Sequence, residues 1–282
     1  MSNKLEVQSE IFRENTNSTS VSSNTLVTTS FNFKYPPDFP YISGKEAEVD
    51  EDGDLLVCRR PVQGVIKIEH SLSTPLATVG LQVWRGALLL ADFILHHGMK
   101  TFLDKNVLEV GAGMGLTSIV ASIFAKRVVA TDVDIGGILA LLKKNFDANK
   151  ALAKSCIQIF PLNFYERNWN FELEKAIKEC NIILAADVIY DNDVTEEFVK
   201  SIEKMLSTPK ILYICLERRY VFTLDDLDTV APCYEHFWKY FDQTRTKPSN
   251  KSWMVEQVPL DFPQYFQYDR NKHLILWKIT KP

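Results

Sequence analysis

One stretch decides the fold of this chain: Val107-Leu108-Glu109-Val110-Gly111-Ala112-Gly113-Met114-Gly115-Leu116. Its apolar beginning predicts a short buried strand, and its alternating glycines predict a tight turn into a helix that begins at Leu116. Glycine lets the backbone tighten at such a turn and lets a ligand approach with no Cβ in the way. The spacing is G-x-G-x-G, whereas the dinucleotide-binding fingerprint G-x-G-x-x-G would need a glycine where Leu116 stands.

An acidic residue follows the next predicted strand. Residues 127–131 form that strand, and Asp132 comes directly after it, 21 positions beyond Gly111. A carboxylate there can accept hydrogen bonds from both hydroxyls of a ribose that lies along the strand ends. The turn and the carboxylate together indicate an adenosine-type ligand, and the glycine spacing favours S-adenosylmethionine over NAD. The alternative is a tight βα turn followed by an exposed capping aspartate.

Strand-like apolar runs alternate with amphipathic helical segments from position 81 onward. This alternation predicts an α/β fold: a doubly wound, mostly parallel Rossmann-like sheet with a ligand at the carboxyl ends of its strands. The last two strands have no helix between them, so we expect an antiparallel pair at the sheet edge. The predicted strands are residues 107–110, 127–131, 157–160, 182–186, 210–216, 252–258 and 273–279. The predicted helices are residues 83–97, a segment from 116, residues 135–148, a segment that begins at Asp193, and residues 226–242. Asp193 is expected to begin its helix as part of a capping box.

Composition and patterning divide the chain into three regions. Residues 1–45 are predicted to be a disordered or extended tail, since residues 14–30 are rich in Ser, Thr and Asn. Residues 46–80 are predicted to form a small β appendage with strand-like runs at 55–58 and 65–68. Residues 81–282 are predicted to form the ligand-binding domain.

Charge and residue usage exclude several classes of protein. The formal net charge is −4, which argues against a broad phosphate-binding surface, so we expect no direct nucleic acid binding. The five histidines are scattered, and we expect no metal site. The sequence begins with no apolar segment and no run approaches eighteen apolar residues, so we expect neither secretion nor a membrane. The five cysteines form no paired framework, which favours an intracellular protein, cytoplasmic or nuclear.

Three motifs resemble those of the family 16 class I methyltransferases. Residues 82–92, QVWRGALLLAD, are similar to the family's W-x-x-x-x-x-L-A helix, and residues 108–116 are similar to its E-x-G-x-G-x-G-L cofactor loop. Residues 187–190, DVIY, match its D-x-x-Y motif. The resemblance implies a seven-strand class I fold, S-adenosylmethionine as cofactor with S-adenosylhomocysteine as product, and methyl transfer to the ε-amine of a lysine in a protein.

The resemblance also assigns roles to individual residues. Trp84 would cover the methionyl or substrate side of the pocket, although a lone Trp on a helix is often a core residue. Ala186 would flank the adenosyl group at the end of its strand. The full set of expected cofactor-binding residues is Trp84, Glu109, Gly111, Ala112, Gly113, Asp132, Asn163, Phe164 and Ala186.

One of these positions departs from the family pattern. Where the family has Leu-Asp-Trp, with an Asp that accepts from the adenine amino group and a Trp that packs on the ring, this chain has Leu162-Asn163-Phe164. Asn163 can still accept through its carbonyl and Phe164 can still stack, but the charge is lost. We therefore expect weaker cofactor binding without loss of catalysis.

Methyl transfer to lysine needs a neutral amine. A lysine with a pKa of about 10.4 is protonated at neutral pH, and neutralising it costs roughly 4–5 kcal/mol. Asp187 is expected to orient the amine and receive its proton, and Tyr190 to line the lysine channel or hydrogen-bond the amine. Alternatively, Asp187 only binds backbone amides of the next turn. Residues 217–219, ERR, are either part of the substrate rim or a solvated edge.

Two other functional classes stay open. A methyltransferase that acts on a small molecule or nucleic acid would use the same cofactor half, although DVIY differs from the Asp/Asn-Pro-Pro-Tyr/Phe motif of enzymes that methylate exocyclic amines of bases. The residues Asn163 and Phe164 would also suit a non-catalytic cofactor-binding scaffold. We expect a monomer. The resemblance implies a protein substrate, and a nuclear nucleic-acid-binding protein is one candidate for that substrate.

Overall fold

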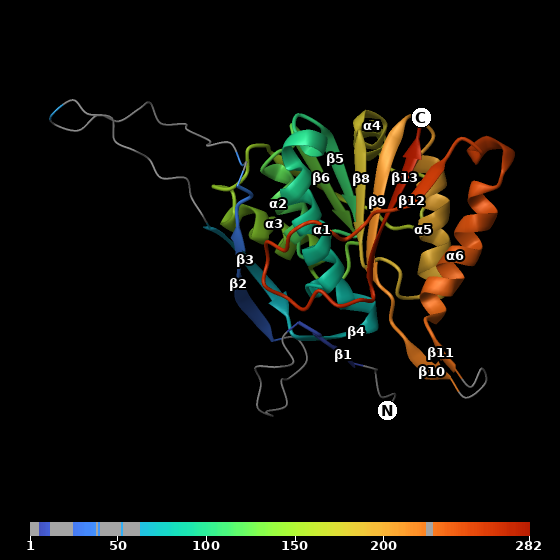
Figure 1. The fold of residues 1–282 in the computed structure, drawn as a ribbon, viewed down its shortest axis with the longest axis horizontal. Helices are drawn as coiled ribbons and strands as arrows, with labels where there is room; N and C mark the ends of the chain where they lie inside the picture. Colours follow the sequence, from blue (N-terminus) through green and yellow to red (C-terminus); the bar gives the residue numbers. More distant parts are fainter. Residues whose placement is uncertain (1–5, 12–24, 38, 40–51, 53–62, 224–227) are drawn as a thin grey trace.

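A seven-stranded sheet forms the centre of the part of the chain that the computed structural model describes, residues 6–11, 25–37, 39, 52, 63–223 and 228–282. The strand order is β12-β13-β9-β8-β5-β6-β7 (Figure 1). The strands are β5 (Asn106–Val110), β6 (Arg127–Asp132), β7 (Ile157–Pro161), β8 (Ile182–Ala186), β9 (Lys210–Glu217), β12 (Met254–Gln257) and β13 (Leu274–Lys281).

The sheet is parallel except at one edge. Strands β5 to β9 pair in parallel, whereas β13 runs antiparallel to β9 and β12 runs antiparallel to β13. The predicted antiparallel pair at the sheet edge is therefore confirmed. Since β13 ends at the top of Figure 1, the parallel strands point downward and their carboxyl ends lie at the lower edge of the sheet.

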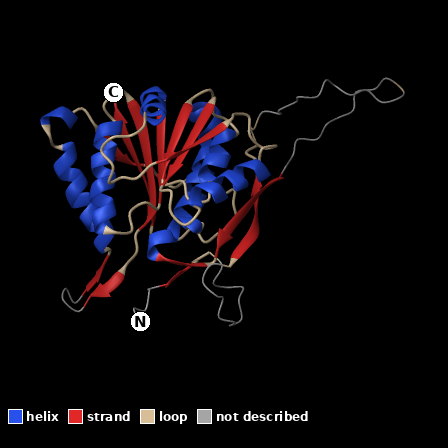
Figure 2. Cartoon of the chain, turned by 180° about the vertical axis from the view of Figure 1, so that it is seen from behind, coloured by secondary structure: helices blue, strands red, loops and turns tan. Residues whose placement is uncertain are grey.

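Helices cover both faces of the sheet, which confirms the doubly wound α/β prediction (Figure 2). Each face packs into its own apolar cluster, because side chains of a central strand alternate between the two faces. On one face lie α1 (Arg85–His97), α2 (Leu116–Ser122) and α3 (Ile138–Ala148), and on the other lie α4 (Phe171–Glu179), α5 (Asn192–Met205) and α6 (Pro232–Arg245).

Helix α1 belongs to the core of the fold. Together with the 3₁₀ turn η2 (Leu76–Leu81) and the π-helical turn η3 (Gly98–Phe102), it forms a segment long and apolar enough to cross a membrane. In the most apolar 18-residue window of this segment, 72% is buried inside the protein. Leu88, Leu89 and Leu90 are fully buried, so the apolar character of α1 is explained by packing on the sheet.

The prediction of a disordered or extended tail over residues 1–45 is wrong where the structure describes paired strands, and residues 1–5, 12–24, 38 and 40–45 lie outside the described residues. Residues 26–34 form β2 (Leu26–Lys34), which pairs antiparallel with β3 (Gln63–Ser71) along nine residues. Phe31 and Phe33, near the end of β2, are buried, and this apolar burial stabilises the pairing. A second short pair joins β1 (Glu6–Gln8) to β4 (Ser73–Pro75). The predicted strand at 65–68 lies within β3, and the run at 55–58 lies outside the described residues.

Two local predictions differ from the structure. The cap of α5 is Asp191, whose carboxylate accepts from the Val194 N–H, so the capping box expected at Asp193 is wrong by two residues. Helix α6 starts later than predicted, with Pro232 in its first turn, where a missing N–H costs nothing. A hairpin of β10 (Val221–Thr223) and β11 (Asp228–Val230) precedes it, and helix α4 and the 3₁₀ turn η4 (Pro248–Asn250) were not predicted.

Candidate functional site

A cavity of about 700 Å³ lies where the parallel strands end. This volume is within the range that small ligands and cofactors occupy. Turn η2 and the beginning of α1 complete its wall. The structure brings together every residue predicted to bind the cofactor or to act in catalysis, since the lining includes Trp84, Glu109, Gly111, Ala112, Gly113, Asp132, Asn163, Phe164, Ala186, Asp187 and Tyr190.

The glycine turn between β5 and α2 forms the floor of this cavity. Gly111 and Gly113 have φ angles of 66° and 49°, in the left-handed region that other residues rarely adopt. A Cβ on Gly111 would lie 2.6 Å from the Val188 side chain, and one on Gly113 would lie 2.9 Å from the Gly80 carbonyl oxygen. Glycine is therefore required both by the backbone conformation and by the close packing.

Asp132 ends β6 and is 9% exposed, unlike the exposed capping aspartate of the alternative interpretation. Its Oδ2 accepts from the Gly113 N–H at 2.7 Å and its Oδ1 accepts from the Val133 N–H at 2.7 Å. Burial raises the pKa of Asp132 to about 6, although both N–H donors oppose the shift. Because a carboxylate has about four acceptor positions, each oxygen can take one further donor from a ligand.

The Glu109 side chain packs beneath the glycine turn, between β5 and α2. It is 1% exposed, and it accepts a hydrogen bond from the Ser118 hydroxyl on α2. Burial raises the pKa of Glu109 to about 8, so the side chain is a neutral acid at pH 7. Glu109 thus ties β5 to the first turns of α2 and adds no negative charge to the cavity.

Glu109→Gln is expected to flatten the dependence of stability on pH. In the unfolded chain Glu109 ionises near 4.5, whereas in the folded protein it holds its proton to about pH 8. Between these values the folded state binds more protons, so the free energy of unfolding falls as pH rises, by at most about 1.4 kcal/mol per pH unit. Urea titrations between about pH 7 and pH 8, above the pKa of about 6 of Asp132, should show this fall in the wild type and much less of it in the variant. Equal slopes would mean that Glu109 is ionised in the folded protein.

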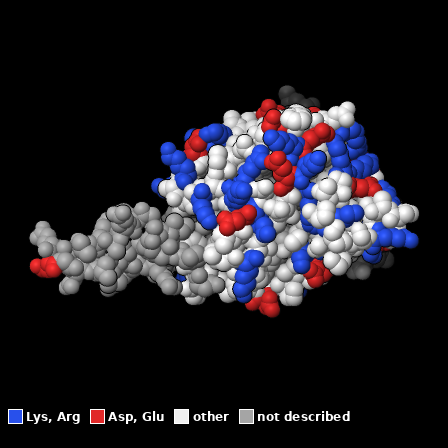
Figure 3. Space-filling view, turned by 90° about the horizontal axis from the view of Figure 1, so that it is seen from above, with Lys and Arg blue, Asp and Glu red and all other residues white. Residues whose placement is uncertain are grey.

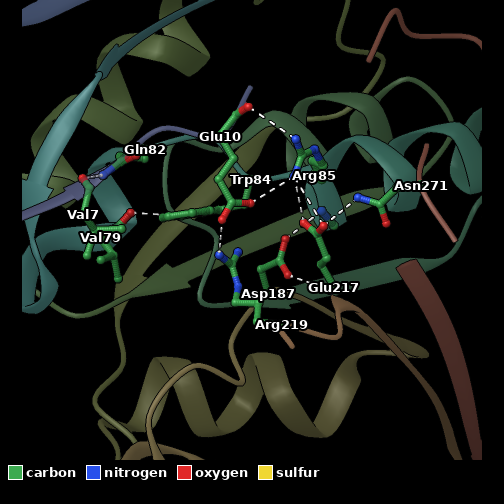
Figure 4. Close-up of polar contacts among 11 residues, drawn as sticks. Val7, Glu10, Val79, Gln82, Trp84, Arg85, Asp187, Glu217, Arg219 and Asn271 are labelled. Carbon is green, nitrogen blue, oxygen red and sulfur yellow. Dashed lines mark hydrogen bonds and ion pairs between the residues drawn. The ribbon is translucent and has the colours of Figure 1, made fainter. Parts of the chain in front are cut away.

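Trp84 stands immediately before α1, and its side chain is half-buried in the cavity wall. Its indole N–H donates to the Val79 carbonyl at 3.0 Å, and the guanidinium of Arg219 lies 4.7 Å from its ring centroid (Figure 4). The ring is thus held by a hydrogen bond at its nitrogen and by contact of one face with a guanidinium.

Asp187 joins α1 to the end of β9. Its Oδ2 accepts from the Gly86 N–H at 2.6 Å and its Oδ1 accepts from the Glu217 N–H at 3.0 Å. Its φ is +52°, a conformation that costs a non-glycine residue energy and that clusters at functional sites. Burial raises the pKa of Asp187, and the nearby Arg219 guanidinium opposes that shift. The structure thus contains the backbone contacts of the alternative interpretation, and it leaves acceptor capacity on each oxygen.

Tyr190 lies three residues beyond Asp187 in the same wall. Burial, together with the carboxylates of Asp132 and Asp191, raises the pKa of its phenol to about 12. The hydroxyl therefore keeps its proton at neutral pH, so it can donate or accept a hydrogen bond but cannot act as a base.

The two residues that depart from the family pattern lie after β7. The Asn163 Oδ1 accepts from the Tyr165 N–H at 3.1 Å, which leaves one acceptor position on that oxygen. The ring of Phe164 is half-buried, and its centroid is 5.3 Å from that of Phe198 on α5. Both side chains therefore line the cavity in fixed positions.

Sequence reasoning missed Gln82, which is 2% exposed and lines the cavity. Its Nε2 donates to the Thr74 hydroxyl at 2.7 Å and to the Val7 carbonyl at 2.8 Å, whereas its Oε1 is buried with no hydrogen-bond partner. An unpaired buried acceptor of this kind costs free energy and suits a donor from a ligand. The sequence signal that could have identified Gln82 as a site residue is its position at the start of the QVWRGALLLAD motif.

Carboxyl groups dominate the charge of the cavity. Two more of them, Asp191 and Asp193, line it beside Asp132 and Asp187. No Lys or Arg occurs among the described residues that line it. The described residues also contain no group of three or more His, Cys, Asp or Glu side chains placed to hold a metal ion.

Two of the predicted rim residues, Glu217 and Arg219, belong to an ion network next to this cavity. Glu217 is 10% exposed and accepts from Arg85 Nη1 at 3.2 Å and from Asn271 Nδ2 at 2.6 Å. The interpretation as a solvated edge is therefore wrong for Glu217. Since the Glu217 N–H also binds Asp187, the network and the cavity share a wall.

Comparisons with known proteins agree with this geometry. A family model described as lysine methyltransferase matches residues 63–230. Methyltransferase-like protein 22 of Mus musculus is 33% identical, over 84% of this chain and 74% of the relative, and its Homo sapiens counterpart is 33% identical, over 83% and 71%. Protein-lysine methyltransferase METTL21E of Mus musculus is 34% identical, over 47% of this chain and 54% of the relative.

Proposed function

Because this chain belongs to the lysine methyltransferase family, we propose that it transfers a methyl group from S-adenosylmethionine to the ε-amine of a lysine in a protein substrate. The observation that carries the proposal is the cavity itself. Four carboxyl groups besides the neutral Glu109 line it, with no Lys or Arg among its described lining residues. Such a cavity attracts a cationic cofactor and a lysine, and it repels the pyrophosphate of NAD.

The residues present fit S-adenosylmethionine. Asp132 would hold the ribose hydroxyls through its remaining acceptor positions, and the unpaired Oε1 of Gln82 would suit the ammonium of the methionyl part. Asn163 and Phe164 would contact the adenine, and Trp84 would cover the methionyl side. When bound, the cofactor supplies a methyl group on a positively charged sulfur, so the protein needs no group to activate the methyl donor.

The remaining task of the protein is to prepare the lysine. Asp187 would orient the amine and receive its proton, since burial raises the pKa of this carboxyl and makes it a better base than an exposed aspartate. The protonated hydroxyl of Tyr190 would accept or donate a hydrogen bond at the amine. Alignment of the amine with the methyl donor and exclusion of water then supply most of the rate enhancement.

Narrower proposals concern the partner and the location. The net charge of −4 favours a protein substrate over direct nucleic acid binding. The face at the amino ends of the parallel strands, opposite the cavity, shows Lys and Arg more prominently than Asp and Glu (Figure 3). We expect a monomer, the unpaired cysteines favour an intracellular location in the cytoplasm or nucleus, and the motif resemblance favours a nuclear nucleic-acid-binding protein as substrate. Light scattering tests whether the chain is a monomer, and imaging of the tagged chain tests its location. Recovery of the methylated protein tests the identity of the substrate.

Asp132→Ala is expected to weaken S-adenosylmethionine binding by about 1–3 kcal/mol, because it removes charge-assisted hydrogen bonds to the ribose. Calorimetry on the full chain measures this, with NAD as the competing ligand. Wild-type affinity should also fall as pH drops through about 6, where Asp132 takes up a proton. An unchanged affinity of the variant would show that Asp132 only holds the turn, and tighter binding of NAD would contradict the proposed cofactor.

A further inference from the structure

Glu10, in the segment that follows β1, binds two arginines beside the cavity (Figure 4). Its Oε2 is 3.1 Å from Arg85 Nη1 and its Oε1 is 2.8 Å from Arg219 Nη1. The Glu10 backbone carbonyl also accepts from Arg85 Nη2 at 3.3 Å. One carboxylate from the N-terminal segment thus bridges a helix start and a strand end that are far apart in the sequence.

Among the described residues, few carboxyl groups balance these arginines. Glu217 pairs with Arg85, and Arg219 pairs with Glu10 and lies near the Asp187 carboxyl. Arg218 has no ion pair to a described residue, and its buried Nε has no hydrogen-bond partner. These three arginines and both glutamates line a second cavity of about 320 Å³. Without Glu10, this cavity would hold an excess of positive charge and a geometry that matches a carboxylate.

The second cavity is placed for substrate recognition. The Arg219 guanidinium lies over Trp84, which lines the cofactor cavity, and Asp187 binds the backbone of Glu217. A carboxylate bound to Arg219 would therefore be separated from the position proposed for the lysine amine by one side chain, that of Trp84. Acidic groups line the cofactor cavity, whereas arginines line its neighbour, so a lysine and an acidic residue would each enter the cavity of opposite charge.

From this arrangement we propose that Arg85 and Arg219 form a carboxylate site that selects an acidic residue next to the target lysine, and that Glu10 is its intramolecular occupant. The inference deepens the proposed function and rests on it. Binding exchanges one carboxylate for another: the Glu10 side chain leaves and an Asp or Glu of the substrate protein takes its two ion pairs. The backbone of β1 need not move, since its pairing with β4 does not involve the Glu10 side chain.

The exchange is energetically accessible. Glu10 is 23% exposed and Arg219 is 35% exposed, and ion pairs in such positions contribute about 0–1 kcal/mol. Arg85 keeps its contact with Glu217 throughout. Glu10 therefore acts as a weak competitor that lowers affinity for all acidic substrates and gives way to those that supply further contacts.

The test measures peptide binding rather than turnover. The probes are a short fluorescein-labelled peptide with one lysine flanked by glutamates and a twin with glutamine in place of each glutamate, both titrated with the full chain in S-adenosylhomocysteine at low salt. Glu10→Gln should bind the glutamate peptide about fivefold more tightly than the wild type does, which corresponds to ~1 kcal/mol. Glu6→Gln changes the same charge in the same segment away from the arginines and should match the wild type. Adding Arg219→Gln to Glu10→Gln should abolish the gain.

Several results would overturn the proposal. If Glu10→Gln tightened both peptides equally, the gain would not depend on the carboxylates of the peptide, and Glu10 would not occupy a carboxylate site. If it weakened binding of the glutamate peptide, or if neither peptide bound any variant, the arginines would not be a carboxylate site for substrate. Calorimetry with S-adenosylmethionine on Glu10→Gln and Glu6→Gln, for which we expect the wild-type affinity, separates this outcome from failure of the proposed function.

Discussion

Asp187→Ala is expected to lower the rate of lysine methylation at least tenfold, which is about 1.4 kcal/mol of activation free energy. The carboxylate holds the Gly86 and Glu217 N–H groups at 2.6 and 3.0 Å and lines the cavity where the amine would enter. Its loss removes the proposed proton acceptor and loosens the start of α1. Affinity for S-adenosylmethionine should change far less, because Asp132 and the glycine turn hold the other end of the cofactor. Rates are measured on a lysine-containing protein acceptor, and cofactor affinity is measured by calorimetry.

The conservative variant Asp187→Asn separates the two roles of this residue. Asn keeps one backbone acceptor but loses the charge, so it should retain more stability than Asp187→Ala. If the carboxylate takes the proton of the amine, Asp187→Asn should stay slow even when fully folded, and its rate should rise more steeply at alkaline pH than that of the wild type. If Asp187→Asn recovered the wild-type rate, or Asp187→Ala kept it, Asp187 would be a structural residue only.

Phe33→Ala is expected to lower the free energy of unfolding by about 3–5 kcal/mol, the usual cost of removing a fully buried aromatic ring. Phe33 is 1% exposed, its ring lies 4.9 Å from that of Tyr35 and 5.2 Å from that of Phe266, and it covers Gly64 on the paired strand β3. Leu26→Ala, on the same strand with a side chain 47% exposed, is the matched control and should change stability by about 0.5 kcal/mol or less. Chemical denaturation measures both. Similar small losses for both variants would contradict the observed docking of β2.

Sequence patterns predicted the parts of the structure that depend on local repeats. The fully apolar run at residues 182–186 became β8 with the same bounds, and the G-x-G-x-G turn and Asp132 met at the ends of β5 and β6 as expected. Parallel strands place their carboxyl ends at one edge, so residues that follow different strands converge without any pairwise signal in the sequence. This explains why all the proposed site residues line one cavity.

Contacts between distant segments could not be predicted in this way. Strand β2 carries Thr, Ser and Asn on its exposed face, so its composition resembles a tail until its partner β3 is known. Asp187 binds the backbone of Gly86 and Glu217, which lie 101 and 30 residues away. Glu10 meets Arg219 across 209 residues. No periodicity encodes such pairs, because each depends on the final packing of the fold.

The central claim is tested most directly by following the methyl group. The purified full chain is incubated with S-adenosylmethionine labelled with tritium in the methyl group and with cell extract, and Asp132→Ala serves as the control. We predict a label that protease digestion removes, that nuclease leaves in place, and that acid hydrolysis recovers as ε-N-methyllysine. Label recovered in RNA or in a small molecule, or no transfer above the control, would contradict the assignment as a protein-lysine methyltransferase.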